Sequence, residues 1–192
     1  MQDFIDQAAK NGVSLLDKGK CQFCGAHCEK GIFDCMANYN SGLELLDFSK
    51  PEYHLLRFLS VDAHALQHPE IHGRWSSHFH LTRLNLILDK SQQWDYEKSP
   101  RLSGYLNEYK LNRPNEFLSL PKPMERGNIT TKDLIHATTA SKCVALIKEW
   151  ADEVYYAWGS NHTLVSQIAD GFLDKNANGK THKGNLKRKH KL

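Results

Sequence analysis

The residues best suited to chemistry are two cysteines near the N-terminus, Cys21 and Cys24, which are separated by two residues and followed by Gly25. Two cysteines at this spacing in a tight turn can direct both sulfurs at one ion, a pattern typical of zinc sites. Tetrahedral zinc needs two further ligands, at about 2.3 Å for sulfur or about 2.0–2.1 Å for nitrogen. The candidates for these ligands are His27, Cys28, Cys35 and His68.

The chain has five cysteines, four of them between residues 21 and 35 and the fifth, Cys143, far away. The first residues lack the basic and apolar segments of a signal peptide, so we expect a cytoplasmic protein whose thiols stay reduced. A metal site is then favoured over disulfides. A thioredoxin-like redox motif is disfavoured, because such motifs join a strand to a helix and the sequence shows no strand pattern. Unligated thiols remain the alternative.

Five histidines lie between residues 64 and 80. His64 and His68 are one helical turn apart, a spacing compatible with ligands to a single ion. His80 falls on the apolar side of its expected helix, where a hydrogen-bonded core histidine is the simplest interpretation.

Asp62, His80 and His162 each lie on an otherwise apolar face of a different expected helix. Buried polar groups persist only where they find partners, so we expect these three side chains to converge on one buried cluster. Such a cluster either extends the zinc site or forms the catalytic floor of a pocket, and the alternative is a purely structural network. For Asp62 the alternatives are a second-sphere partner of a metal-bound histidine and a structural ion pair.

The elements that must position these residues are expected to be helices. Pro51 fits the first turn of a helix that Pro69 ends just after His68. Thr130 with Asp133 resembles a capping box that opens a short helix. We expect a mainly α protein, an irregular four-helix bundle with an N-terminal cysteine-rich zinc loop. The expected segments are the loop at 20–35, main helices at 33–46, 51–68, 74–90 and 141–172, and a weaker helix near 102–110, all in one domain spanning 1–174.

Charge is unevenly distributed along the chain. The segment from Lys175 to Leu192 carries seven Lys and Arg residues and no Asp or Glu, which leaves 18 basic and 22 acidic residues and a net charge of −4 for the body. We therefore expect 175–192 to be a basic disordered tail, and nucleic acid to be an unlikely partner except through that tail. No apolar run approaches the ~20 residues that cross a bilayer, so no membrane partner is expected.

The order of motifs resembles an uncharacterised bacterial family of small cytoplasmic proteins. That family has a Cys-Pro-x-Cys-Gly knuckle, a third cysteine ten or more residues later, and a helix reading Val-Asp-Ala-Tyr-x-Leu-Gln-His-Pro. The matching positions here are Cys21, Cys24, Gly25, Cys35, Val61 to Pro69, Phe79 to Leu81, Trp150-Ala151, Val154-Tyr155, Ala157-Trp158 and Asn161-His162.

The resemblance covers about residues 21 to 170 and implies a site without naming a reaction. It implies that the third cysteine ligand is Cys35 rather than Cys28, and it gives weight to His68, His80 and His162. The chain departs from the family pattern at three positions and has Cys28 in addition. The departures are Gln22 for the knuckle proline, His64 for the tyrosine and Arg57 for a frequent upstream histidine.

Two functions follow from these features. The first is a zinc-binding helical protein of unknown activity, in which Cys21, Cys24, Cys35 and His68 hold one structural ion. The second is a metal-dependent enzyme, a hydrolase or thiol transferase acting on a small molecule, with a histidine-lined pocket that resembles the DinB-like bundles in arrangement. A nucleic-acid-binding knuckle is disfavoured, since basic and aromatic residues are not interleaved with the cysteines.

Overall fold

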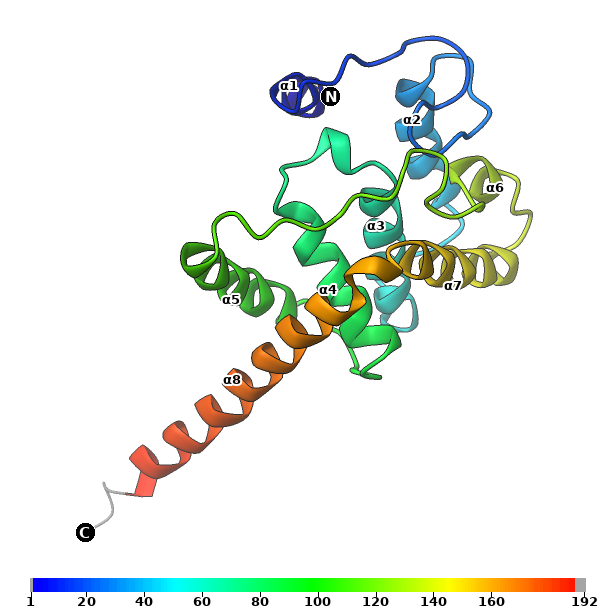
Figure 1. Ribbon diagram of the computed structural model, residues 1–192. Coiled ribbons are helices and arrows are strands. Elements are labelled where there is room, and N and C mark those ends of the chain that lie inside the picture. Colours follow the sequence, from blue (N-terminus) through cyan, green and yellow to red (C-terminus); the bar gives the residue numbers. More distant parts are fainter. Residues whose placement is uncertain (1, 189–192) are drawn as a thin grey trace.

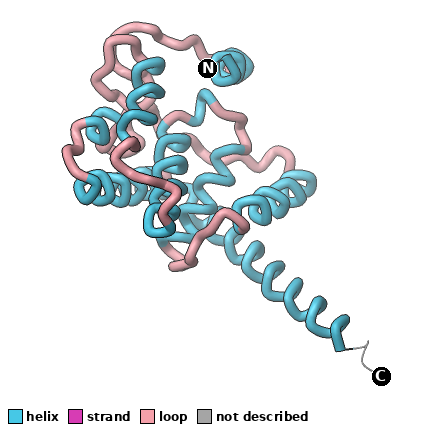
Figure 2. The backbone as a smooth tube through the Cα atoms, turned by 180° about the vertical axis from the view of Figure 1, so that it is seen from behind, coloured by secondary structure: helices cyan, strands magenta, loops and turns pink. Residues whose placement is uncertain are grey.

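The computed structural model describes residues 2–188, and within them the regular elements are all helical (Figures 1 and 2). The prediction of a mainly α protein is confirmed. The α-helices are α1 (Gln2–Lys10), α2 (Ile32–Gly42), α3 (His54–Gln67), α4 (Ser76–Leu88), α5 (Lys98–Asn112), α6 (Thr131–Ile135), α7 (Ala140–Ala157) and α8 (His162–Arg188). Three 3-10 turns join them, η1 (Pro51–Tyr53), η2 (Pro69–Ile71) and η3 (Gly159–Asn161).

The main core lies around α3, which packs against α7 on one side and α4 on the other, while α4 also packs against α8. Leu66 of α3, Leu84 of α4 and Trp150 of α7 are each fully buried there. The indole of Trp158 is also buried and donates a hydrogen bond to the carbonyl of Leu66 over 3.2 Å. The apolar faces of these helices are therefore buried mainly by packing against one another.

The predicted single helix at 141–172 is wrong, because the chain breaks between α7 and α8. Gly159, Ser160 and Asn161 form η3 at the break. The side chain of Asn161 pairs with the backbone of Ser119, accepting from its N–H over 2.8 Å and donating to its carbonyl over 2.9 Å. This contact fixes the long connection after α5 against the break.

The four helices predicted to form the bundle are not the helices that form the main core. The helix expected at 33–46 is α2, which packs mainly on the short helix α6 rather than within the main core. Gly42 makes this contact close, because a Cβ at that position would lie 2.6 Å from the Cβ of Leu134. The capping box of α6 is present as expected, with Thr130 and Asp133 satisfying each other's backbone groups.

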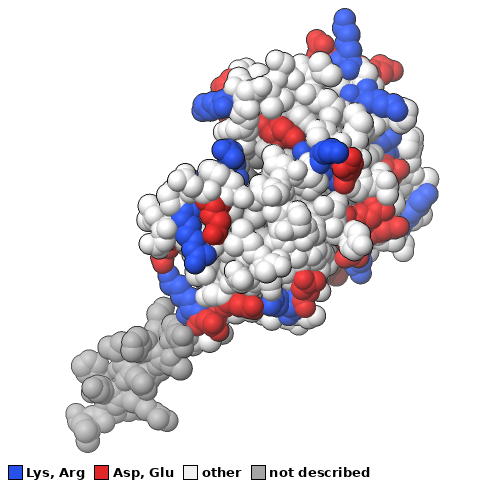
Figure 3. All heavy atoms as spheres, in the orientation of Figure 1, with Lys and Arg blue, Asp and Glu red and all other residues white. Residues whose placement is uncertain are grey.

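Helix α8 continues to Arg188 and extends beyond the other helices (Figure 1). The bounds of α8 include 175–188, and residues 189–192 lie outside the described part of the chain. The disordered basic tail expected at 175–192 stays a prediction. On the face shown in Figure 3, Lys and Arg are interspersed with Asp and Glu, and neither sign forms a continuous patch. Across the described helices, none has an apolar segment long enough to cross a membrane.

Candidate metal centre

Four buried side chains from three separate segments meet at one point. They are Cys21, Cys24, Cys35 and His68, and their ligand atoms all lie within 4.8 Å of one another. None of the four residues is more than 6% exposed. The structure therefore brings together the four residues predicted as metal ligands, and the group can hold a metal ion.

The separations inside the group match a tetrahedron around one ion. Bonds of about 2.3 Å to sulfur and 2.0–2.1 Å to nitrogen place two sulfurs about 3.8 Å apart and a sulfur about 3.6 Å from a nitrogen. The Sγ atoms of Cys24 and Cys35 are 3.6 Å apart. The Nε2 atom of His68 lies 3.5 Å from Sγ of Cys21 and 3.4 Å from Sγ of Cys35. These three separations lie within about 0.2 Å of the tetrahedral values, and the remaining ones are within 4.8 Å.

The knuckle, residues 21–25, is a tight turn whose backbone requires a positive φ at Gly25. Its φ of +77° lies in the left-handed region, which glycine adopts without the cost that a side chain imposes. The Gly25 N–H donates to the carbonyl of Cys21 over 2.9 Å, and the Cys21 N–H donates to the carbonyl of Ala26 over 2.9 Å. The turn so formed directs the first two sulfurs inward.

Gln22 ties the knuckle to the preceding segment. Its side-chain oxygen accepts from the Leu16 N–H over 2.5 Å, and its amide nitrogen donates to the Ser14 carbonyl over 3.0 Å. A proline at this position would lack both contacts. The Gln22 side chain therefore holds the knuckle against residues 14–16.

Cys35 reaches the group from the first turn of α2. The helix begins after Gly31, whose φ of +54° and proximity to the Leu16 carbonyl leave no room for a Cβ. The Sγ of Cys35 also lies 3.3 Å from the hydroxyl of Thr131, the first residue of α6. In the thiolate form of Cys35 the hydroxyl is the donor of this pair and stabilises the charge on the sulfur.

His68 is held so that Nε2 faces the three sulfurs. Its Nδ1 donates to the carbonyl of His64, one turn earlier, over 2.7 Å. This arrangement, in which the second ring nitrogen donates to a carbonyl, is the usual one for metal-bound histidine. His64 thus contributes its backbone to the site while its own ring lies against Tyr39, with the ring centroids 4.4 Å apart.

Electrostatics within the group favour a charged arrangement. Hydrogen bonds from Cys24 and Cys35, and then the proximity of His68, lower the pKa of Cys21 well below its ordinary value. Burial acts to lower the pKa of His68, but negative charge at Cys24 and hydrogen bonds with the sulfurs outweigh it and raise that pKa to about 10. Hydrogen bonding with Cys21 and Cys24 raises the pKa of Cys35. The group therefore stabilises a thiolate at Cys21 beside a protonated His68, and it disfavours a second thiolate at Cys35.

Cys28, the other candidate for third cysteine, lies outside the group. Its Sγ accepts a long hydrogen bond, 3.8 Å, from the Asn38 amide. Burial, and then the negative charges of Cys21 and Cys24, raise the pKa of its thiol to about 11. Cys28 is therefore a neutral thiol beside the site, not part of the four-residue set.

Asp62 and His80 do meet, in a cluster of their own. The fully buried Asp62 carboxylate accepts from Nδ1 of His80 over 2.6 Å. It also accepts from Nε and Nη2 of Arg83 over 2.8 and 2.5 Å. The guanidinium is itself buried, so this is a desolvated ion pair of the kind that requires close geometry.

His162 does not join this cluster, and the expectation that Asp62, His80 and His162 converge is wrong. Its Nε2 bonds to the carbonyl of Tyr155 over 2.9 Å, and its ring stacks on the Tyr155 ring with centroids 4.1 Å apart. The break between α7 and α8 places His162 at the first position of α8, where it folds back on the end of α7.

Comparison with known proteins identifies the family to which the chain belongs. A family of unknown function, DUF5946, matches residues 19–159, which is most of the chain. The chain belongs to this family. The matched range contains the four clustered ligand residues together with Asp62 and His80, and it ends before His162. No curated protein and no solved structure is significantly similar.

Several residues that support the site were not found from the sequence. Arg126, 1% exposed, pairs with Glu70 through two hydrogen bonds of 2.8 and 2.6 Å. Gln67, next to the ligand His68, donates to the carbonyl of Arg126 over 3.2 Å. These contacts hold the connection before α6 against the end of α3, beside the knuckle. Charged residues in a long loop give no sequence signal for such pairing.

Proposed function

We propose that this protein binds one zinc ion through Cys21, Cys24, Cys35 and His68, and that the ion is structural. The observation that carries the proposal is the set of four buried donors within 4.8 Å of one another, with the His68 ring oriented by a backbone carbonyl. Three thiolates and one imidazole suit zinc better than the hard cations, which prefer oxygen. A set of four protein ligands is closed, as in structural zinc sites, whereas catalytic zinc keeps a position for water.

The position of the group supports a structural role. It lies in a small core, separate from the main one, which the N-terminal segment, the knuckle and the start of α2 share. Zinc would link this core to the end of α3, because His68 directly follows the last residue of that helix. The binding energy of the ion would add directly to folding. The buried residues of the small core are Ala8, Cys21, Phe23, Cys24, Ala26, Ile32, Cys35 and Ile71.

The alternative proposal, a metal-dependent enzyme, has less support. Its histidine-lined pocket requires His80 and His162 near the metal, and neither belongs to the group of four clustered donors. His162 bonds instead to the carbonyl of Tyr155. A catalytic role would also need one of the four ligands to leave so that water or substrate can bind.

Zinc content and metal-dependent folding test the proposal together. The purified protein should contain about one zinc per chain, and the Cys21→Ser, Cys24→Ser double variant should contain none. Cys28→Ser is the matched control, because this cysteine is a neighbour of the site but not part of it, and it should keep the metal. Removing zinc from the native protein with a chelator should lower its melting temperature, and restoring zinc should recover it.

Three results would overturn the proposal. They are zinc retained in the double variant, zinc lost from the Cys28→Ser control, and a chelator-treated protein that is free of metal yet unchanged in melting temperature. The last would leave a zinc site without a structural role.

A further inference from the structure

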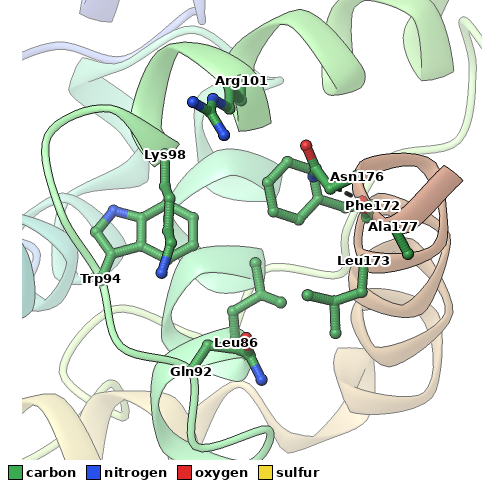
Figure 4. Close-up of a pocket in the computed structure, with 9 residues that line it drawn as sticks. All are labelled: Leu86, Gln92, Trp94, Lys98, Arg101, Phe172, Leu173, Asn176 and Ala177. Atoms are coloured by element: carbon green, nitrogen blue, oxygen red, sulfur yellow. Dashed lines mark hydrogen bonds between the residues drawn. The ribbon is translucent and has the colours of Figure 1, made fainter. Parts of the chain in front are cut away.

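A second feature of the molecule is a groove of about 300 Å³ formed by α4, the segment after it, α5 and α8 (Figure 4). It shares no residue with the metal centre. Its volume is at the lower end of the range for small-molecule sites. The lining residues are Leu86, Gln92, Trp94, Lys98, Arg101, Phe172, Leu173, Asn176 and Ala177.

The groove combines an apolar interior with positive charge. Leu86, Phe172 and Leu173 point into it from α4 and α8, while Lys98 and Arg101 enter from α5 (Figure 4). Among the described residues that line it, none carries a carboxylate. A ligand with an apolar body and one negative group matches this distribution.

The guanidinium of Arg101 is available to a ligand. Within residues 2–188 its ion pair is a long contact of 3.4 Å with Glu97, in which both side chains are more than half exposed. A pair of this kind contributes little, so a carboxylate can replace it without much cost. Lys98 is partly exposed, stands 3.9 Å from Asp95 and donates to the carbonyl of Gln93. Arg101 can bind a carboxylate through two parallel hydrogen bonds, and Lys98 adds a second charge.

The aromatic wall of the groove is fixed in place. The indole N–H of Trp94 donates to the hydroxyl of Ser99 over 3.1 Å, and Arg83 donates to the same oxygen over 3.2 Å. Arg83 is in turn held by the buried carboxylate of Asp62. Because a buried ion pair anchors the wall, little side-chain entropy is lost when a ligand packs against it.

We propose that this groove binds a small amphipathic carboxylate, a medium-chain fatty acid or an aryl acid of similar size. The apolar chain lies against Leu86, Trp94 and Phe172, and the carboxylate meets Arg101 and Lys98 at the rim. The proposal is independent of the zinc, so either can fail while the other holds.

Matched eight-carbon probes test it on the zinc-loaded full chain. Octanoate, octanol and octylamine share a tail and differ in charge, and the indole N–H resonance of Trp94, assigned with a Trp94→Phe variant, reports occupancy. Octanoate should bind on the order of tenfold more tightly than octanol and more tightly still than octylamine. In the Lys98→Gln, Arg101→Gln double variant octanoate should bind no better than octanol, whose affinity stays unchanged.

The matched control is a Lys142→Gln, Lys148→Gln double variant, which removes two exposed charges from α7 and should keep the preference for octanoate. Equal affinity for octanoate and octanol, no shift of the Trp94 resonance, or an equal loss in the control would each overturn the proposal. Octanol binding as tightly as octanoate would identify the groove as an uncharged apolar contact surface.

Discussion

Replacing Asp62 with asparagine tests how much the buried ion pair contributes to the fold. The carboxylate is fully buried and accepts three hydrogen bonds, two from Arg83 and one from His80. The amide of the Asp62→Asn variant keeps the shape but removes the charge, and so leaves the guanidinium buried without a counterion. Breaking a buried pair on one side costs about 3–5 kcal/mol, and we expect Asp62→Asn to lower the free energy of unfolding by that amount.

Urea unfolding measures this loss, with zinc at the same excess in every sample so that metal binding does not alter the comparison. The matched control is Asp170→Asn, which breaks an exposed pair with Lys90 and should cost less than about 1 kcal/mol. A double variant, Asp62→Leu with Arg83→Met, removes both charges and should recover much of the stability. The reasoning is refuted if Asp62→Asn costs no more than the surface control.

Two further predictions concern packing and pH. Gly42→Ala should destabilise the protein by about 1–3 kcal/mol in urea unfolding, because the new Cβ would lie 2.6 Å from the Cβ of Leu134. The control is Gly104→Ala in α5, where a new Cβ would have no neighbour within 4 Å. This variant should be neutral or stabilising. Burial lowers the pKa of His78 to about 4, so the unfolded chain binds more protons and this residue's contribution to stability should fall as pH drops from about 6.5 to 4. His78→Phe should flatten that part of the stability profile relative to wild type, and an unchanged profile would contradict the assignment.

Three of the four clustered residues have a local signal in the sequence. Cys21 and Cys24 form a knuckle with glycine at the position that needs a positive φ, and Pro69 fixes where the helix bearing His68 must end. The choice of Cys35 over Cys28 came from the family resemblance, and spacing alone left it open. That the four side chains meet at tetrahedral spacing depends on the packing of α2 and α3, which no local pattern specifies.

The failure at His162 has a definite cause. In the sequence, an apolar stripe continues through Trp158, which predicted an unbroken helix. Gly159 and Asn161 instead allow the chain to leave the helix. The Asn161 side chain then accepts a hydrogen bond from the backbone of Ser119, 42 residues earlier. Asp62 shows the opposite case. A buried carboxylate requires a counterion, and Arg83, one turn after His80 on the same helix, was a partner that the spacing could have identified.

The most direct test of the central claim is the zinc-edge X-ray absorption spectrum of the purified full-length protein, recorded with its metal content. The four clustered side chains predict about one zinc per chain with three sulfur neighbours near 2.3 Å and one nitrogen neighbour near 2.0–2.1 Å. Protein that carries no zinc and takes up none, or a metal shell of nitrogen and oxygen without sulfur, would contradict the account.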